Sequence, residues 1–206
     1  MSPGLTKGEE TRGRIIEKAA EAFADRGYAA TSLNDLVGAS GLTKGAFYFH
    51  FDSKEALALE VFRSRHEAWG GKVLATMSEH ERAIDRLMGI MRTVAGMIEA
   101  DPSSRCVGRL AEELSADPSL APIVKRQFDQ WVELSADLLR HAQDEGDARP
   151  DLDARAVSEV AVAGFIGLEK ISGVHEMDLG RLVETFVGLL TEAVRPREPA
   201  ETGRGS

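Results

Sequence analysis

Apolar residues recur every three or four positions along most of the chain, which is the spacing of one face of an α-helix. The pattern predicts a first helix over residues 11–26, with Ile15 and Phe23 on its apolar stripe and Gly27 placed to end it. No segment shows the strict alternation of apolar and polar residues that is typical of a β-strand. The sequence therefore predicts an all-α protein.

Two short helices separated by a glycine turn come next. Thr31 or Ser32 can cap the first, which should stop at the glycines within residues 38–41. Thr43 can cap the second, which is expected from residue 44 to about residue 49. Two short helices across a tight turn that contains glycine form a helix-turn-helix.

Longer helices account for the rest of the chain. The periodicity predicts helices over about residues 54–77, 83–100, 122–145, 154–172 and 179–194, and one more that starts at Asp101-Pro102. Asp52 or Ser53 can cap the first of these, and Asp52 with Glu55 has the spacing of a capping box. Gly70 and Gly71 should weaken the middle of the same helix.

The charged residues divide the chain into two unequal parts. Residues 1–65 hold nine Lys or Arg and nine Asp or Glu, so the remaining 16 basic and 25 acidic residues carry the whole net charge of −9. Only the neutral part is suited to approach phosphate. We expect a helix-turn-helix domain over residues 9–53 and a larger helical domain over residues 54–195. The tail 196–206 and the first eight or so residues are expected to be disordered.

Several classes of function leave no trace in the sequence. There is no P-loop, GxSxG or HExxH motif and no metal-spaced set of Cys and His, and the His-Glu neighbours at His66, His80 and His175 are interpreted as solvated helix faces. We therefore expect no enzyme activity, no cofactor and no metal. No apolar run is long enough to cross a membrane, no secretory signal is seen, and the single Cys106 should be a small buried hydrophobe. The expected location is cytoplasmic.

The segment LTKGAFYFHF, residues 42–51, carries the chemistry of a helix that lies in the major groove of DNA. Lys44 can reach a base edge or a phosphate, and Gly45 has no side chain to hold the backbone away from DNA. Phe47 and Phe51, four residues apart, should pack inward. The expected DNA contacts are Thr31, Ser32, Thr43, Lys44, Gly45, Tyr48, His50 and Lys54. The alternative is an aromatic-rich corner of a helical bundle with its lysines solvated.

This part of the sequence resembles the DNA-binding domain of the TetR family of transcriptional regulators. The resemblance lies in AAEAFADRGYAATSLNDLVGASGLTKGAFYFHFDSKEAL, and Gly38 and Ser40 depart from it, since they stand where the family usually has alanine. It implies an all-α homodimer with an N-terminal helix-turn-helix and a larger domain for ligand binding and dimerisation. The resemblance places Thr43, Lys44, Gly45 and Tyr48 at DNA-contacting positions, and Thr31, His50 and Lys54 nearer the DNA backbone.

The later part of the chain is similar to the γ-butyrolactone receptor branch of that family, in DPSSRCVGRLAEEL, QWVELSADLLRHAQDEGDARPDLDARAV and GFIGLEKIS. The similarity implies that Trp131 contacts the ligand, although its place on an apolar helical stripe is equally typical of a core tryptophan. The expected pocket residues are Phe128, Trp131, Ser135 and Phe165, with Thr93 and Ser172 as further polar candidates. Such a lining suits a small lipophilic effector.

The predicted function is a transcriptional repressor that binds a pseudo-palindromic operator in double-stranded DNA as a homodimer and is released by that effector. A γ-butyrolactone-type signal is one candidate. The alternative is a regulator that senses a different hydrophobic compound or has lost ligand binding. The last two helices fit an internal core pair or a two-fold dimer interface equally well. Effector binding near Trp131 should shift the helix of residues 54–77 and change the spacing of the two recognition helices.

Overall fold

The computed structural model describes residues 6–197, and in that range the chain is all-α, as predicted, with no β-strand. The elements are α1 (Lys7–Arg26), α2 (Leu33–Ser40), α3 (Lys44–Tyr48), α4 (Lys54–Met77), α5 (Ala83–Ala100), the 3₁₀ helix η1 (Pro102–Arg105), α6 (Cys106–Ser115), α7 (Ala121–Asp144), α8 (Ala154–His175) and α9 (Leu179–Val194). The tail predicted over 196–206 lies, apart from its first two residues, outside the described residues, as do residues 1–5.

The start of α1 corrects two predictions. The helix begins at Lys7 rather than at residue 11, so residues 6–8 are ordered as its cap and first turn. Thr6 and Glu9 form a capping box, in which the Thr6 hydroxyl accepts the Glu9 N–H and the Glu9 carboxylate accepts the Thr6 N–H at 2.7 Å. The reciprocal bonds satisfy backbone donors that would otherwise face water, and they extend the helix beyond its apolar stripe.

The caps of the next three helices settle the alternatives in the sequence. Ser32, not Thr31, caps α2, and Gly41 ends that helix at φ 68°, a left-handed conformation that glycine adopts without strain. Thr43 caps α3 as predicted. Ser53 caps α4, so the capping box expected from Asp52 does not form.

The longer helices follow the predicted spans closely. Helix α4 runs without a break through Gly70 and Gly71, because packing of its buried face outweighs their low helix propensity. Helix α5 has the predicted bounds, and the predicted helix at Pro102 consists of a short 3₁₀ turn followed by α6. Helix α8 continues almost one turn beyond the predicted end and stops at Glu176, whose φ is 51°.

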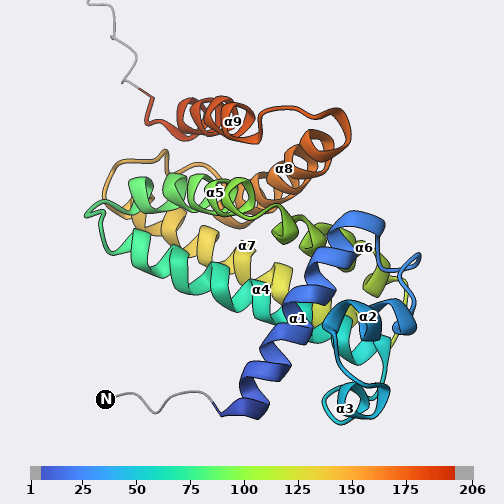
Figure 1. Ribbon diagram of the computed structural model, residues 1–206. Coiled ribbons are helices and arrows are strands. Elements are labelled where there is room, and N and C mark those ends of the chain that lie inside the picture. The colour runs from blue at the N-terminus through green and yellow to red at the C-terminus, as the bar shows by residue number, and fades with distance from the viewer. Residues whose placement is uncertain (1–5, 198–206) are drawn as a thin grey trace, which may run out of the picture.

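The helices form two parts joined by α4 (Figure 1). Helices α2 and α3 lie at one end of the molecule beside α1, and α1 packs on α4 and α6. Helix α5 packs on both α4 and α7, while α8 and α9 form the layer farthest from α3. Phe47 and Phe51 are buried, as predicted, and their ring centroids lie 6.4 Å apart. Cys106 is also buried as expected, and burial raises the pKa of its thiol to about 12.

Candidate functional site

The outer face of α3 brings several of the predicted DNA contacts onto one surface. Thr43, Lys44, Gly45 and Tyr48 are all exposed. The Thr43 hydroxyl accepts the Ala46 N–H at 3.3 Å, which leaves its own hydrogen free to be donated. Lys44 Nζ lies 6.0 Å from the centre of the Tyr48 ring and forms no ion pair with any residue in the described range. This face of α3 is therefore exposed to solvent and carries a positive charge at Lys44.

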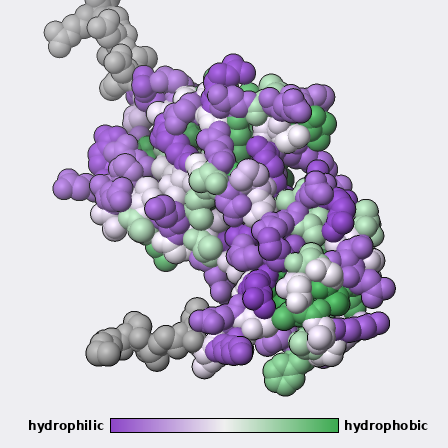
Figure 2. Space-filling view, in the orientation of Figure 1, coloured by the Kyte–Doolittle hydropathy of each residue, from purple (hydrophilic) through white to green (hydrophobic). Residues whose placement is uncertain are grey.

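Phe49 belongs to the same surface and was missed by the sequence analysis. Its side chain is 86% exposed, and its ring meets His50 edge-on with centroids 5.3 Å apart. Phe47 and Phe51 point into the core, and Phe49 lies midway between them, where the helical period turns it outward. Figure 2 shows an apolar area over α2 and α3, bordered by hydrophilic residues. Apolar side chains of this kind can contact the methyl group of thymine.

Two of the predicted DNA contacts form hydrogen bonds inside the protein. Thr31 is fully buried, and its hydroxyl donates to the Gly27 carbonyl at 2.7 Å. Lys54 Nζ donates to the carbonyls of Tyr28 and Thr31 at 3.0 and 3.2 Å and lies 4.0 Å from the centre of the Tyr28 ring. Both residues thus stabilise the turn between α1 and α2. The contact predicted for Thr31 is wrong because the residue is buried, whereas Lys54 is partly exposed and its contact stays a prediction. The partners of Lys54 lie 23 and 26 residues earlier in the chain, which a single sequence does not indicate.

Ser32 is exposed, but a carboxylate already occupies the start of α2. The Ser32 hydroxyl and N–H donate to Asp35 Oδ2 at 2.6 and 2.9 Å. These bonds from Ser32 lower the pKa of Asp35 and keep it charged. A phosphate would meet that negative charge, so Ser32 is poorly placed for the predicted contact.

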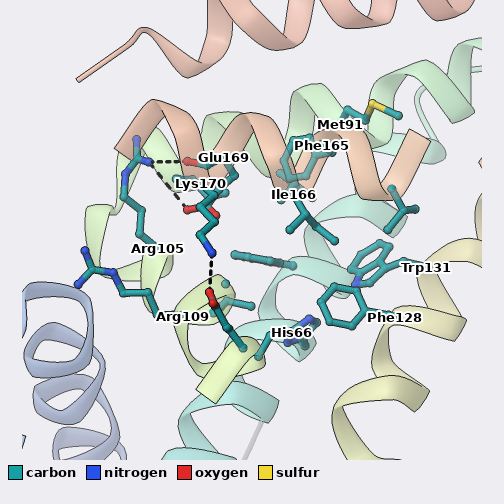
Figure 3. A pocket seen from close by; sticks show the side chains of 18 of the residues that line it. His66, Met91, Arg105, Arg109, Phe128, Trp131, Phe165, Ile166, Glu169 and Lys170 are labelled. Carbon is teal, nitrogen blue, oxygen red and sulfur yellow. Dashed lines mark hydrogen bonds and ion pairs between the residues drawn. The ribbon is translucent and has the colours of Figure 1, made fainter. Parts of the chain in front are cut away.

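A cavity of about 470 Å³ lies among α4, α5, α6, α7 and α8 (Figure 3). Its size falls in the range of small-molecule sites. All four predicted pocket residues, Phe128, Trp131, Ser135 and Phe165, line it, whereas Thr93 and Ser172 do not. Trp131 is half-buried, and with Phe128 it forms one wall on α7, facing Phe165 and Ile166 of α8. The interpretation of Trp131 as part of a pocket wall is therefore favoured over that of a filled core.

The α4 side of the cavity contains His66, which the sequence analysis wrongly placed on a solvated face. Its side chain is only 4% exposed, and its ring lies between Phe62 and Trp69, with centroid distances of 4.3 and 5.4 Å. Burial lowers the pKa of His66 to about 4, so the imidazole is neutral at neutral pH. Apolar residues at positions 62 and 69, one turn either side of His66, were the available signal for a buried histidine.

The other end of the cavity is charged. Arg105 Nη1 lies 3.8 Å from Glu169 Oε1, and Lys170 Nζ bonds Glu112 Oε2 at 2.6 Å, linking α8 to α6. Figure 3 shows these groups at the opposite end from Trp131. Burial raises the pKa of Glu169, and the charge of Arg105 opposes that rise. Arg109 also lies at this end and forms no ion pair within the described residues, so three basic side chains face two carboxylates there.

Helix α6 connects the cavity to the turn between α1 and α2. Ala111 and Glu112 line the cavity, and the next residue, Glu113, faces that turn. The Glu113 carboxylate accepts the N–H groups of Tyr28 and Ala29 at 3.2 and 2.7 Å. Arg109, which also lines the cavity, donates to the carbonyl of residue 24 at 2.9 Å. A displacement of α6 would therefore move the turn that precedes α2 of the helix-turn-helix.

The layer of α8 and α9 carries exposed apolar side chains. These are Val160, Ile171 and Val174 on α8, Met177 in the following turn and Leu189 on α9. Gly164 lets the two helices approach, because a Cβ at that position would lie 2.4 Å from Cζ of Phe186. An uncovered apolar face of this kind is typical of a protein interface.

Within residues 6–197, no group of acidic, His or Cys side chains is arranged to hold a metal ion. No helix of the described chain is long and apolar enough to cross a membrane.

Comparisons with known proteins agree with this arrangement. The family model "Bacterial regulatory proteins, tetR family" matches residues 15–61. The HTH-type transcriptional repressor KstR2 of Mycobacterium tuberculosis is 30% identical over 150 residues, which are 71% of this chain and 73% of the relative. The A-factor receptor protein of Streptomyces griseus is 26% identical over 172 residues, 84% of this chain and 57% of that protein. The structure of TylP, a TetR regulator from Streptomyces fradiae, matches with a TM-score of 0.72 and 31% identity, over 92% of this chain and 89% of that one.

Proposed function

The chain belongs to the tetR family of bacterial regulatory proteins and is a transcriptional repressor. We propose that it binds operator DNA through α3 and is released from the DNA by an effector in its cavity. The operator is a pseudo-palindrome in double-stranded DNA, read by a homodimer in the cytoplasm. The family and the relatives above are regulators of transcription and not enzymes. One observation carries the proposal: α4 and α6 each reach from the cavity to the helix-turn-helix.

The DNA contacts are assigned to the open face of α3. Thr43 and Lys44 supply hydrogen-bond donors for base edges or phosphates, and Gly45 allows the backbone to come close, since a Cβ there would meet nothing within 4 Å. We assign phosphate oxygens to Tyr48 and His50, and an apolar contact with a base to Phe49. The net charge of −9 makes these few local groups, instead of bulk charge, responsible for affinity.

The dimer interface is assigned to α8 and α9. Their exposed apolar residues support this assignment, because uncovered aliphatic side chains gain free energy when a partner removes them from water. A two-fold axis through this layer leaves α3 of each subunit at the far end of the assembly. Two recognition helices about 34 Å apart would read successive major grooves on one side of the DNA. This domain division, with residues 9–53 on DNA and residues 54–195 for effector and dimer, is part of the proposal.

The effector is assigned to a small lipophilic compound. Phe128, Trp131 and Phe165 offer aromatic surface to it, and Ser135 offers a hydroxyl. The A-factor receptor protein among the relatives makes a γ-butyrolactone-type signal the first candidate to test. Arg105 and Lys170 at the charged end are already paired with Glu169 and Glu112, so we assign the effector to the aromatic end of the cavity, which favours a neutral ligand over an ionic one.

Release follows from the helices that the two sites share. An effector held against α4 and α6 favours a conformation in which Lys54 and Glu113 hold the turn between α1 and α2 in a different place. The two copies of α3 then no longer fit successive grooves. This is a shift of population, so the effector must bind the DNA-free conformation more tightly than the bound one.

The test is a mobility-shift titration on the DNA upstream of the protein's own gene, at a stated salt concentration. The wild-type protein should form a specific complex, and Lys44→Ala should lose it while remaining folded and dimeric. Lys125→Ala, which removes a lysine of α7 outside the α3 surface, is the matched control and should bind as the wild type does. Retained operator affinity in Lys44→Ala would remove the assignment of α3 to the groove.

A further inference from the structure

The α4 side of the cavity holds a buried donor without an acceptor. Trp69 is 8% exposed and lines the cavity, and its indole Nε1–H has no hydrogen-bond partner within residues 6–197. Buried polar groups in folded proteins are nearly always paired, since an unpaired donor loses its bond to water without replacement. An N–H left over in the wall of a cavity is therefore suited to an acceptor atom that a ligand brings.

His66 supplies an acceptor in the same place. Its Nδ1 lies 3.0 Å from the Phe62 carbonyl oxygen, which can only accept, so Nδ1 carries the hydrogen. The ring is neutral because burial lowers its pKa to about 4. In that tautomer Nε2 is a bare lone pair, and no residue in the described part of the chain donates to it. His66 lines the cavity as well.

The two rings lie on one face of α4, three residues apart, with centroids 5.4 Å from one another. A hydroxyl group is the one simple function that both accepts and donates a hydrogen bond through a single oxygen. A ketone or an ether can accept from Trp69 but leaves His66 Nε2 unpaired. Leu87, Met91 and Val94 line the same cavity and offer apolar contact to the rest of the ligand.

We propose that the α4 side of the cavity binds a hydroxyl group of the effector, which accepts a hydrogen bond from Trp69 Nε1–H and donates one to His66 Nε2. The effector class is therefore a neutral apolar alcohol, and an apolar ketone or ether of the same size binds less tightly. The inference rests on the proposed function, because it takes the cavity as the effector site. It adds a polar subsite on α4 to the aromatic wall that Trp131 and Phe128 form on α7.

The test uses three probes with the same carbon frame: 2-octanol, 2-octanone and 2-methoxyoctane. Full-length protein carrying ¹⁵N-tryptophan shows two indole N–H resonances, because the chain has two tryptophans. The resonance that remains in Trp131→Phe belongs to Trp69. All three probes should shift it, and 2-octanol should bind about tenfold more tightly than the other two, since only the alcohol pairs His66 Nε2.

Variants assign the preference to the two rings. In His66→Phe, whose ring can occupy the same space between Phe62 and Trp69, the advantage of the alcohol should disappear while the Trp69 resonance still shifts. Trp69→Phe should weaken all three probes. His80→Phe, a histidine outside the cavity lining, is the matched control and should keep the preference.

Equal affinity for the three probes in the wild type would overturn the subsite, as would a preference for the alcohol that survives in His66→Phe. An unmoved Trp69 resonance, or no binding of any probe, would overturn it too. The wild-type measurements need no variant to fold. Operator binding is measured on the same preparations. If the subsite fails its test while operator binding is intact, the proposed function stands without the subsite. If the alcohol preference is seen but no operator binding is found, the subsite stands and the proposed function fails.

Discussion

The contact between α6 and the turn after α1 offers the sharpest prediction about coupling. Glu113→Ala removes the carboxylate that accepts two backbone N–H groups, those of Tyr28 at 3.2 Å and Ala29 at 2.7 Å. Each such bond contributes about 0.5–1.5 kcal/mol net, and the exposure of Ala29 places its bond at the lower end. We expect the free energy of unfolding to fall by about 1–2 kcal/mol. In a chain of this length that lowers Tm by roughly 2–8 °C.

The assay combines thermal unfolding at one fixed protein concentration with hydrogen exchange at the amides of residues 28 and 29. Both amides should be protected in the wild type and should exchange faster in Glu113→Ala. For unfolding and amide exchange the matched control is Glu112→Ala, which loses an exposed ion pair with Lys170 that contributes about 0–1 kcal/mol. Operator release by effector should also weaken in Glu113→Ala. Unchanged Tm and unchanged amide protection would refute the role given to Glu113.

Three further outcomes are expected. Trp131→Ala should keep operator binding but lose release by an organic extract of the source culture, and normal release would return Trp131 to a purely structural role. Gly164→Ala should cost about 1–3 kcal/mol in the free energy of unfolding, because its Cβ would lie 2.4 Å from Phe186. Gly96→Ala, in α5 and outside the proposed dimer interface, meets nothing within 4 Å and should gain up to about 1 kcal/mol, so equal Tm values for the two would contradict the packing. Burial lowers the pKa of His66 from 6.5 to about 4, so as the pH falls the unfolded state binds a proton more readily than the folded state does. The free energy of unfolding should therefore be hardly affected by His66 above about pH 6.5, and it should fall by about 2 kcal/mol between pH 7.5 and 5 in urea unfolding. That part of the pH dependence should be absent in His66→Phe.

Local signals predicted most of the fold. The apolar period and the cap residues placed α5 at its observed bounds and identified Thr43 as the cap of α3, because both depend on neighbours a few positions away. The start of α1 was missed because the capping box at residues 6–9 precedes the apolar stripe.

Long-range contacts limited the prediction of the two sites. Thr31 and Lys54 have the residue types of phosphate ligands, but each is committed to a backbone carbonyl. The partners of Lys54 lie 23 and 26 residues away along the chain. Glu113 bonds residues 84 and 85 positions away, which no local pattern indicates. The pocket wall at Trp131 was found through its helical stripe, whereas the role of His66 depends on tertiary burial.

Coupling of operator binding to a ligand in the cavity can be measured as the operator affinity of the purified protein. A mobility shift at fixed salt compares this affinity with and without organic extract of the source culture. We expect a specific complex that the extract releases in the wild type and no longer releases in Trp131→Ala. A wild-type complex whose affinity stays the same at saturating effector would contradict this coupling.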